Sequence, residues 1–104
     1  MSTKVHQLQL LQQNIQNINI QQQQLRNLLL ELDSAVQELI NTKKAYKIIG
    51  GLMIESDPEK LIKELNEKKS VSQLRLKNFD ESEEKLKKNM ELLQKEVIKE
   101  LKAK

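Results

Sequence analysis

Side chains able to do acid–base, nucleophilic or metal chemistry are few in this chain and do not gather. His6 is the only histidine and cysteine is absent from the 104 residues. His6 therefore lacks the cluster of ligands that a metal site needs, and neither a disulfide nor a thiolate metal site can form. His6 also lies near the start of the chain, where we expect it to face solvent. The sequence predicts no catalytic residue, no metal site and no enzyme activity.

Gly50 and Gly51 are the only glycines, and they are the one place where backbone could approach a phosphate closely. The lysine, the serine or threonine and the further glycines of a phosphate-binding loop are missing around them. A tight turn is the better interpretation of the pair. We expect no cofactor.

Charge is spread unevenly along the chain. Residues 1–42 carry two basic and three acidic side chains, whereas residues 43–104 carry 16 basic and 12 acidic ones. In the second part the two signs alternate over short distances, as on a solvated helix face. A nucleic-acid surface is usually of one sign and carries stacking aromatics, but Tyr46 and Phe79 are the only aromatic residues. We expect no nucleic-acid partner; the alternative, binding through the lysines of residues 85–104, would weaken steeply with salt.

No apolar run reaches the roughly 18 residues of a membrane span. The first residues, "MSTKVHQLQLLQQ", lack the apolar core of a signal peptide, and the absence of cysteine gives no sign of an oxidising compartment. We expect a soluble cytoplasmic protein without membrane contact.

A heptad pattern runs through residues 8–39, where apolar side chains recur at alternating steps of three and four. One polar residue, Gln22, interrupts it, and glutamines such as those at 21–24 fill outer positions. Because glutamine is a fair helix former, we expect a helix over about residues 5–44 and not a disordered tract. The seam of this helix consists of Leu8, Leu11, Ile15, Ile18, Gln22, Leu25, Leu29, Leu32, Val36 and Leu39.

A second, less regular heptad pattern lies in a helix that we expect over about residues 58–103. Its start fits either a capping box from Ser56 to Glu59 or an Asp57 cap followed by Pro58 in the first turn. Folded back on each other, the two helices would pair antiparallel, with ends that fray and expose apolar groups. The second seam consists of Ile62, Leu65, Lys69, Ser72, Leu76, Phe79, Glu83, Leu86, Met90, Leu93, Val97 and Glu100.

Between the helices, residues 45–56 form an apolar ribbon around Gly50 and Gly51. Paired glycines suit the positive φ angles of a type I′ turn, which predicts a β-hairpin. Its register would pair Ile49 with Leu52, Ile48 with Met53, Lys47 with Ile54 and Tyr46 with Glu55. Both faces would be apolar, one with Ile49, Leu52 and Ile54 and the other with Tyr46, Ile48 and Met53.

A lone two-stranded hairpin is marginally stable in water, and its open edges accept further strands. The ribbon therefore predicts assembly through a sheet or barrel shared between subunits. The expected fold is mainly α: a long antiparallel two-helix coiled coil joined by one β-hairpin that contributes to an intersubunit sheet or β-barrel, in a single domain over residues 1–104. The alternative is an apolar loop folded onto its own helix ends.

The chain resembles a prefoldin subunit of the β type. The resemblance covers nearly the whole chain and is carried by "YKIIGGLMI" at 46–54 and "QLRLKNFDESEEKL" at 73–86. One hairpin between the helices is similar to the β class and unlike the α class.

This resemblance implies an ATP-independent chaperone, a holdase that binds unfolded polypeptides at the coiled-coil tips and delivers them to a group II chaperonin. It implies a hetero-hexamer of two α-type and four β-type subunits, so the partners are prefoldin α-type subunits, further copies of the chain, unfolded clients and the chaperonin. The hairpin residues expected to join subunits are Tyr46, Ile48, Ile49, Gly50, Gly51, Leu52, Met53 and Ile54.

Apolar residues near both termini are the candidate client surface, because apolar groups on a splayed end can accept an unfolded chain. For each one singly, a partial wrap of the seam or an ordinary surface position is an equal alternative. They are Val5, Leu8, Leu10, Leu11, Ile15, Leu93, Val97, Ile98 and Leu101.

Two further alternatives remain. Four lysines at the end of the chain could contact an acidic partner, although cations that complement the helix dipole explain each one alone; they are Lys95, Lys99, Lys102 and Lys104. The chain could also be a structural coiled-coil scaffold or tether that recognises a partner helix through its seam, which would leave the ribbon unexplained.

Overall fold

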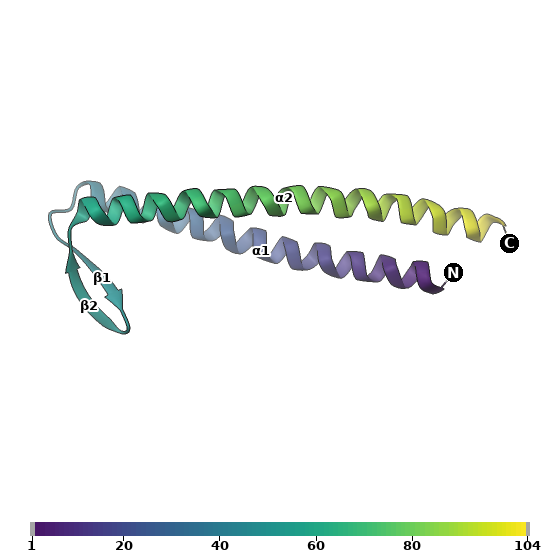
Figure 1. Cartoon of the computed structure of the whole chain (residues 1–104), viewed down its shortest axis with the longest axis horizontal. Coiled ribbons are helices and arrows are strands. Elements are labelled where there is room, and N and C mark those ends of the chain that lie inside the picture. Colours follow the sequence, from purple (N-terminus) through teal and green to yellow (C-terminus); the bar gives the residue numbers. More distant parts are fainter. Residues whose placement is uncertain (1, 104) are drawn as a thin grey trace. The chain divides into compact units, whose positions relative to one another are not determined.

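The computed structural model describes residues 2–103, which form two helices and one hairpin. In chain order these are α1 (Ser2–Ile40), β1 (Ala45–Ile49), β2 (Leu52–Ser56) and α2 (Pro58–Ala103), as Figure 1 shows. The mainly α class, with one hairpin between two long helices, is confirmed. Over the described part of the chain, neither helix combines the length and apolar content needed to cross a membrane.

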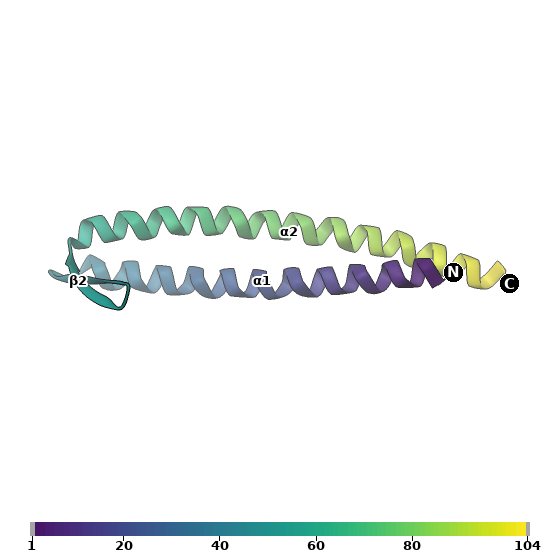
Figure 2. The same cartoon turned by 60° about the horizontal axis from the view of Figure 1, so that its bottom comes forward.

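The chain divides into two compact units. The first holds the residues up to Gln24 and those from Leu76 onward, and the second holds Leu25–Arg75. Within each unit α1 and α2 lie side by side and run in opposite directions (Figures 1 and 2). In the first unit Gln22 Nε2 donates a hydrogen bond of 2.8 Å to Asp80 Oδ1, and in the second a 2.5 Å ion pair joins Lys69 to Asp33.

The two heptad seams are confirmed by burial. Every predicted seam position of α1 and of α2 is buried or half-buried, including the polar ones. Gln22 is only 2% exposed and Ser72 4%, so both contribute to packing alongside leucines such as Leu25 and Leu32. Because two-helix packing hides one stripe of each helix, the remaining positions are mostly exposed.

The first helix is shifted from the predicted span of 5–44. It begins at Ser2 and ends at Ile40, so the predicted end at residue 44 is wrong. Beyond the end of the helix, the Thr42 hydroxyl donates to the Glu38 carbonyl at 2.6 Å and the Thr42 N–H donates to the Leu39 carbonyl at 3.2 Å. These bonds satisfy carbonyl groups that a helix end leaves without partners.

The start of α2 follows the second of the two predicted caps. Asp57 Oδ1 accepts a hydrogen bond of 3.2 Å from the Glu59 N–H, and the Asp57 carbonyl accepts one of 3.0 Å from the Leu61 N–H. Asp57 is therefore the N-cap and Pro58 takes the first helical position, where its missing N–H is harmless. Ser56 cannot serve as the cap because it belongs to β2, paired with Ala45.

The hairpin has the predicted register. Ile49 pairs with Leu52, Ile48 with Met53, Lys47 with Ile54 and Tyr46 with Glu55. Gly50 and Gly51 have φ angles of 56° and 80°, and two successive positive φ angles are what a type I′ turn requires.

Candidate functional site

The hairpin leaves its apolar side chains open to solvent on both faces. Its six large apolar side chains are 46–71% exposed, and they are Tyr46, Ile48, Ile49, Leu52, Met53 and Ile54. The alternative of a loop folded onto its own helix ends is therefore wrong. Burying such side chains is favourable by about 1.5–3 kcal/mol each when complete, so this surface is suited to contact with other subunits.

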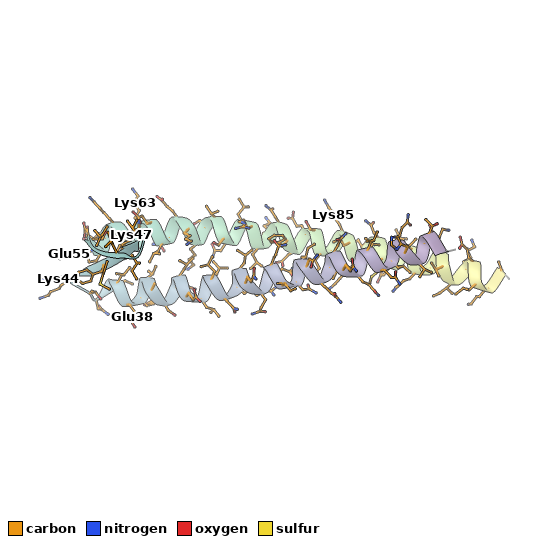
Figure 3. The ribbon with its side chains drawn as sticks, turned by 90° about the horizontal axis from the view of Figure 1, so that it is seen from below. Glu38, Lys44, Lys47, Glu55, Lys63 and Lys85 are labelled. Carbon is orange, nitrogen blue, oxygen red and sulfur yellow. The ribbon has the colours of Figure 1, made fainter. Side chains whose placement is uncertain are left out.

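The base of the hairpin is fixed to the helices. Ala45 is buried, and Lys47 Nζ on β1 lies 2.9 Å from Glu64 Oε2 on α2. Charged side chains from every element of this unit surround the base, as Figure 3 shows for Glu38, Lys44, Lys47, Glu55 and Lys63. Charged side chains therefore lie near the end of the hairpin that joins the helices, and the rest of the hairpin is mainly apolar.

A hollow of about 400 Å³ opens beside this base. Its apolar part comes from Leu39, Tyr46, Leu61 and Leu65, and its rim carries the Lys47–Glu64 pair.

Polar residues inside the seams find partners across or along the helices. Gln22 bonds to Asp80 and Lys69 pairs with Asp33, while Glu83 lies 3.8 Å from Lys87 one turn further along α2. No buried side-chain nitrogen or oxygen of the described residues lacks a hydrogen-bond partner. Such polar layers fix the register of paired helices at some expense of stability.

The predicted client residues all lie in the first unit, but they do not form one surface. Val5, Leu10, Ile98 and Leu101 are exposed. Four seam members are half-buried: Leu8, Leu11, Leu93 and Val97. Ile15 is only 8% exposed, so it can meet a client only where the helices separate.

The exposed members divide between the two flanks of the seam. Leu10 comes one position before a seam residue. Val5 and Leu101 each come one position after a seam residue, namely Lys4 and Glu100. At 3.6 residues per turn these positions lie about 100° to either side of the seam. The predicted tip cluster is therefore two separate surfaces.

A groove of about 440 Å³ hollows the flank that carries Leu10. Four leucines form its apolar wall: Leu10 and Leu11 from α1, and Leu92 and Leu93 from α2. Its polar rim consists of Gln7, Asn14, Asn89 and Glu96. An apolar wall with a few polar groups at its edge is typical of binding sites.

An ionic cluster closes the seam beyond this groove. Lys4 and Glu100 both occupy seam positions, and Lys4 Nζ lies 2.5 Å from Glu100 Oε1 and 3.6 Å from Glu96 Oε2. The hydrogen bond to Glu100 raises the pKa of Lys4 above its usual 10.5; the charges of Glu100 and Glu96 add to the rise and desolvation opposes it. Fraying of the ends remains a prediction, and this cluster is the interaction that fraying would have to break.

Leu92 is the functional candidate that the heptad pattern missed. It is 61% exposed and lines the groove together with the α1 leucines. The pattern selects Leu93 for the seam and leaves Leu92 as an ordinary outer residue. The signal that could have found it is symmetry, because Leu10-Leu11 and Leu92-Leu93 are the same kind of pair on antiparallel helices.

Side chains for metal chemistry do not gather in residues 2–103, where no three histidine or acidic side chains are placed to hold an ion. His6 is exposed. Lys95, Lys99 and Lys102 are exposed on the last turns of α2, and Lys104 lies outside the described residues.

Comparison with known proteins supplies the family. A family model described as "Prefoldin subunit" matches residues 2–104. This chain belongs to the prefoldin subunit family. The prefoldin chain is 38% identical over 85 residues to prefoldin subunit beta of Archaeoglobus fulgidus, covering 79% of this chain and 73% of that one. It is 32% identical over 100 residues to prefoldin subunit beta of Sulfurisphaera tokodaii, covering 93% and 80%.

The fold of this prefoldin subunit matches a solved relative. The crystal structure of the prefoldin beta subunit from Thermococcus strain KS-1 superposes with a TM-score of 0.84 at 26% identity, over 92% of this chain and 87% of the other. The β-type resemblance drawn from the hairpin is thereby confirmed. Membership of the prefoldin family supports a chaperone subunit role and assembly with other prefoldin subunits.

Proposed function

We propose that this prefoldin subunit works as part of an ATP-independent holdase in the cytoplasm. In a hexamer of two α-type and four β-type subunits, its hairpin joins the shared barrel. Its coiled-coil end captures unfolded polypeptide, which passes to a group II chaperonin. The chain carries out no covalent chemistry and needs no cofactor.

The leucine-walled groove of the first unit is the observation that carries this proposal. Leu10 and Leu92 are 46% and 61% exposed on a flank that no other described part of the chain covers. An exposed apolar patch with a polar rim is the usual form of a protein-binding surface. Capture by this patch requires only apolar side chains from the client, which suits clients of unrelated sequence.

Replacing both leucines tests the proposal. Since Leu10 and Leu92 are exposed, Leu10→Ser with Leu92→Ser should leave the helices intact and remove apolar area from the groove. We expect the two substitutions together to remove about 2 kcal/mol of the free energy of client binding, which lowers client affinity roughly thirtyfold. The measurement is light scattering of a diluted, denatured client with increasing amounts of the assembled complex.

Ile20→Ser with Leu74→Ser is the matched control. These residues are as exposed, at 57% and 60%, but lie outside the groove, so this pair should still suppress aggregation. Equal protection by the two variants would contradict capture at the groove. A chain that acts only as a scaffold would suppress no aggregation in any form.

A further inference from the structure

The lining of the groove contains a single ionised side chain. Four leucines and the amide side chains of Gln7, Asn14 and Asn89 make up the rest, and Glu96 stands at the end nearer the chain termini. Amides accept and donate hydrogen bonds without preference for a charge. Glu96 is therefore the ionised group that a guest in the groove meets directly, and Lys4 and Lys99 line the adjoining hollow beside it.

Glu96 can accept a cation from outside the chain because its partner Lys4 also pairs with Glu100. Lys4 Nζ lies 3.6 Å from Glu96 but 2.5 Å from Glu100. A cationic guest at Glu96 would displace the longer contact while Lys4 keeps the shorter one. The Glu96 side chain is 58% exposed, so a guest can reach it from solvent.

The size of the groove limits what it can hold. Its volume of about 440 Å³ lies in the lower part of the roughly 300–1,000 Å³ range of small-molecule sites. That space accommodates a few side chains of a polypeptide at a time. A cation close to those side chains would fall beside Glu96.

We propose that the groove selects short apolar segments of unfolded polypeptide that have a lysine or arginine next to the apolar residues, and that Glu96 pairs with this cation. The inference rests on the proposed function, since it specifies which clients the capturing surface prefers. The preference is opposite to the one that the whole chain would impose, because its net charge of +3 attracts acidic segments.

Fluorescence anisotropy of short labelled peptides tests the preference with the full-length chain. Three peptides share one leucine-containing core and differ only in the flanking residue, which is lysine, glutamine or glutamate. We expect the lysine peptide to bind about two- to fivefold more tightly than the glutamine peptide, as for one exposed ion pair, and the glutamate peptide to bind most weakly. The difference should shrink as salt is added.

Glu96→Gln should abolish the ranking, so that the lysine, glutamine and glutamate peptides bind with similar affinity. Glu91→Gln is the matched control, since Glu91 is an exposed carboxylate on the same helix that does not line the groove, and it should keep the ranking. Lys4→Gln frees Glu96 from its internal partner and should strengthen the preference. Circular dichroism of each variant checks that the helices are retained.

Equal binding of the three peptides, or a ranking that survives Glu96→Gln, would overturn the inference. So would peptide binding that falls as protein concentration rises, because the groove would then be occupied by a second copy of the chain. If the chain suppresses client aggregation but binds none of the peptides, the inference fails and the proposed function stands. If it suppresses no aggregation, the proposed function fails.

Discussion

Ile48 and Leu52 offer the sharpest test of how the subunit assembles. They belong to opposite strands and opposite faces of the hairpin, and they are 71% and 68% exposed in the single chain. Replacing both by aspartate removes nothing that the chain buries by itself. The helices should therefore keep their content by circular dichroism, while any contact that covers the hairpin is damaged on both faces.

The expected loss follows from these exposures. Fully burying an isoleucine or leucine stabilises by about 1.5–3 kcal/mol, and roughly 70% of each side chain is still available for burial, which gives about 1–2 kcal/mol per residue. An unpaired carboxylate in the covered sheet adds a penalty of several kcal/mol. With about 1.4 kcal/mol for each tenfold change, association should weaken by at least about a thousandfold.

Sedimentation velocity with an α-type prefoldin partner measures the result. The double variant should sediment as separate subunits at concentrations where the unchanged chain forms a complex. Leu30→Asp is the control, because Leu30 is 66% exposed on α1 of the same unit but away from the hairpin, and it should assemble normally. A double variant that still sediments at the mass of the complex would refute the role of the hairpin.

Three further predictions concern the coiled coil. Removing residues 1–11 and 94–104 deletes much of the groove but leaves the hairpin, so the trimmed chain should join the complex yet fail to prevent client aggregation in light scattering; full protection would contradict this. Gln22→Leu replaces a polar seam residue by an apolar one and should raise the melting temperature, with about 1 kcal/mol of added stability; a lower melting temperature would show that its bond to Asp80 outweighs apolar packing. The pKa of Lys4 is raised above 10.5 by its bond to Glu100, so its contribution to stability is complete below pH 10.5 and disappears as pH rises through the raised value. The stability difference between the unchanged chain and Lys4→Met should vanish over that alkaline range, and a difference that persists there would rule out the ion pair as its source.

Local sequence rules determine most of the fold. The register of the hairpin follows from one fact, that Gly50 and Gly51 can both adopt positive φ, and once the turn is placed every cross-strand pair is set. The seams follow from heptad spacing, which held even at the polar positions Gln22 and Ser72, since both are buried.

The end of α1 and the groove could not be obtained in the same way. Lys43 and Lys44 favour helix, so residue propensity alone gives no reason for the helix to end at Ile40. The heptad pattern says which residues face the partner helix, but not which flank is hollow. That depends on the side chains that both helices place on the same flank, here Leu10 with Leu92 and the amides Asn14 and Asn89.

The two-stranded sheet of β1 and β2 also has a consequence for the chain before it meets a partner. Each strand pairs with the other along one side only, so both outer edges keep unpaired backbone groups beside exposed isoleucine, leucine and methionine side chains. Open edges next to apolar faces are the arrangement on which fibrous aggregates grow. A closed ring of strands has no open edge, whereas every chain that remains unassembled exposes two. Balanced synthesis of the subunits, or rapid proteolysis of those left over, is therefore a demand that this hairpin places on the cell.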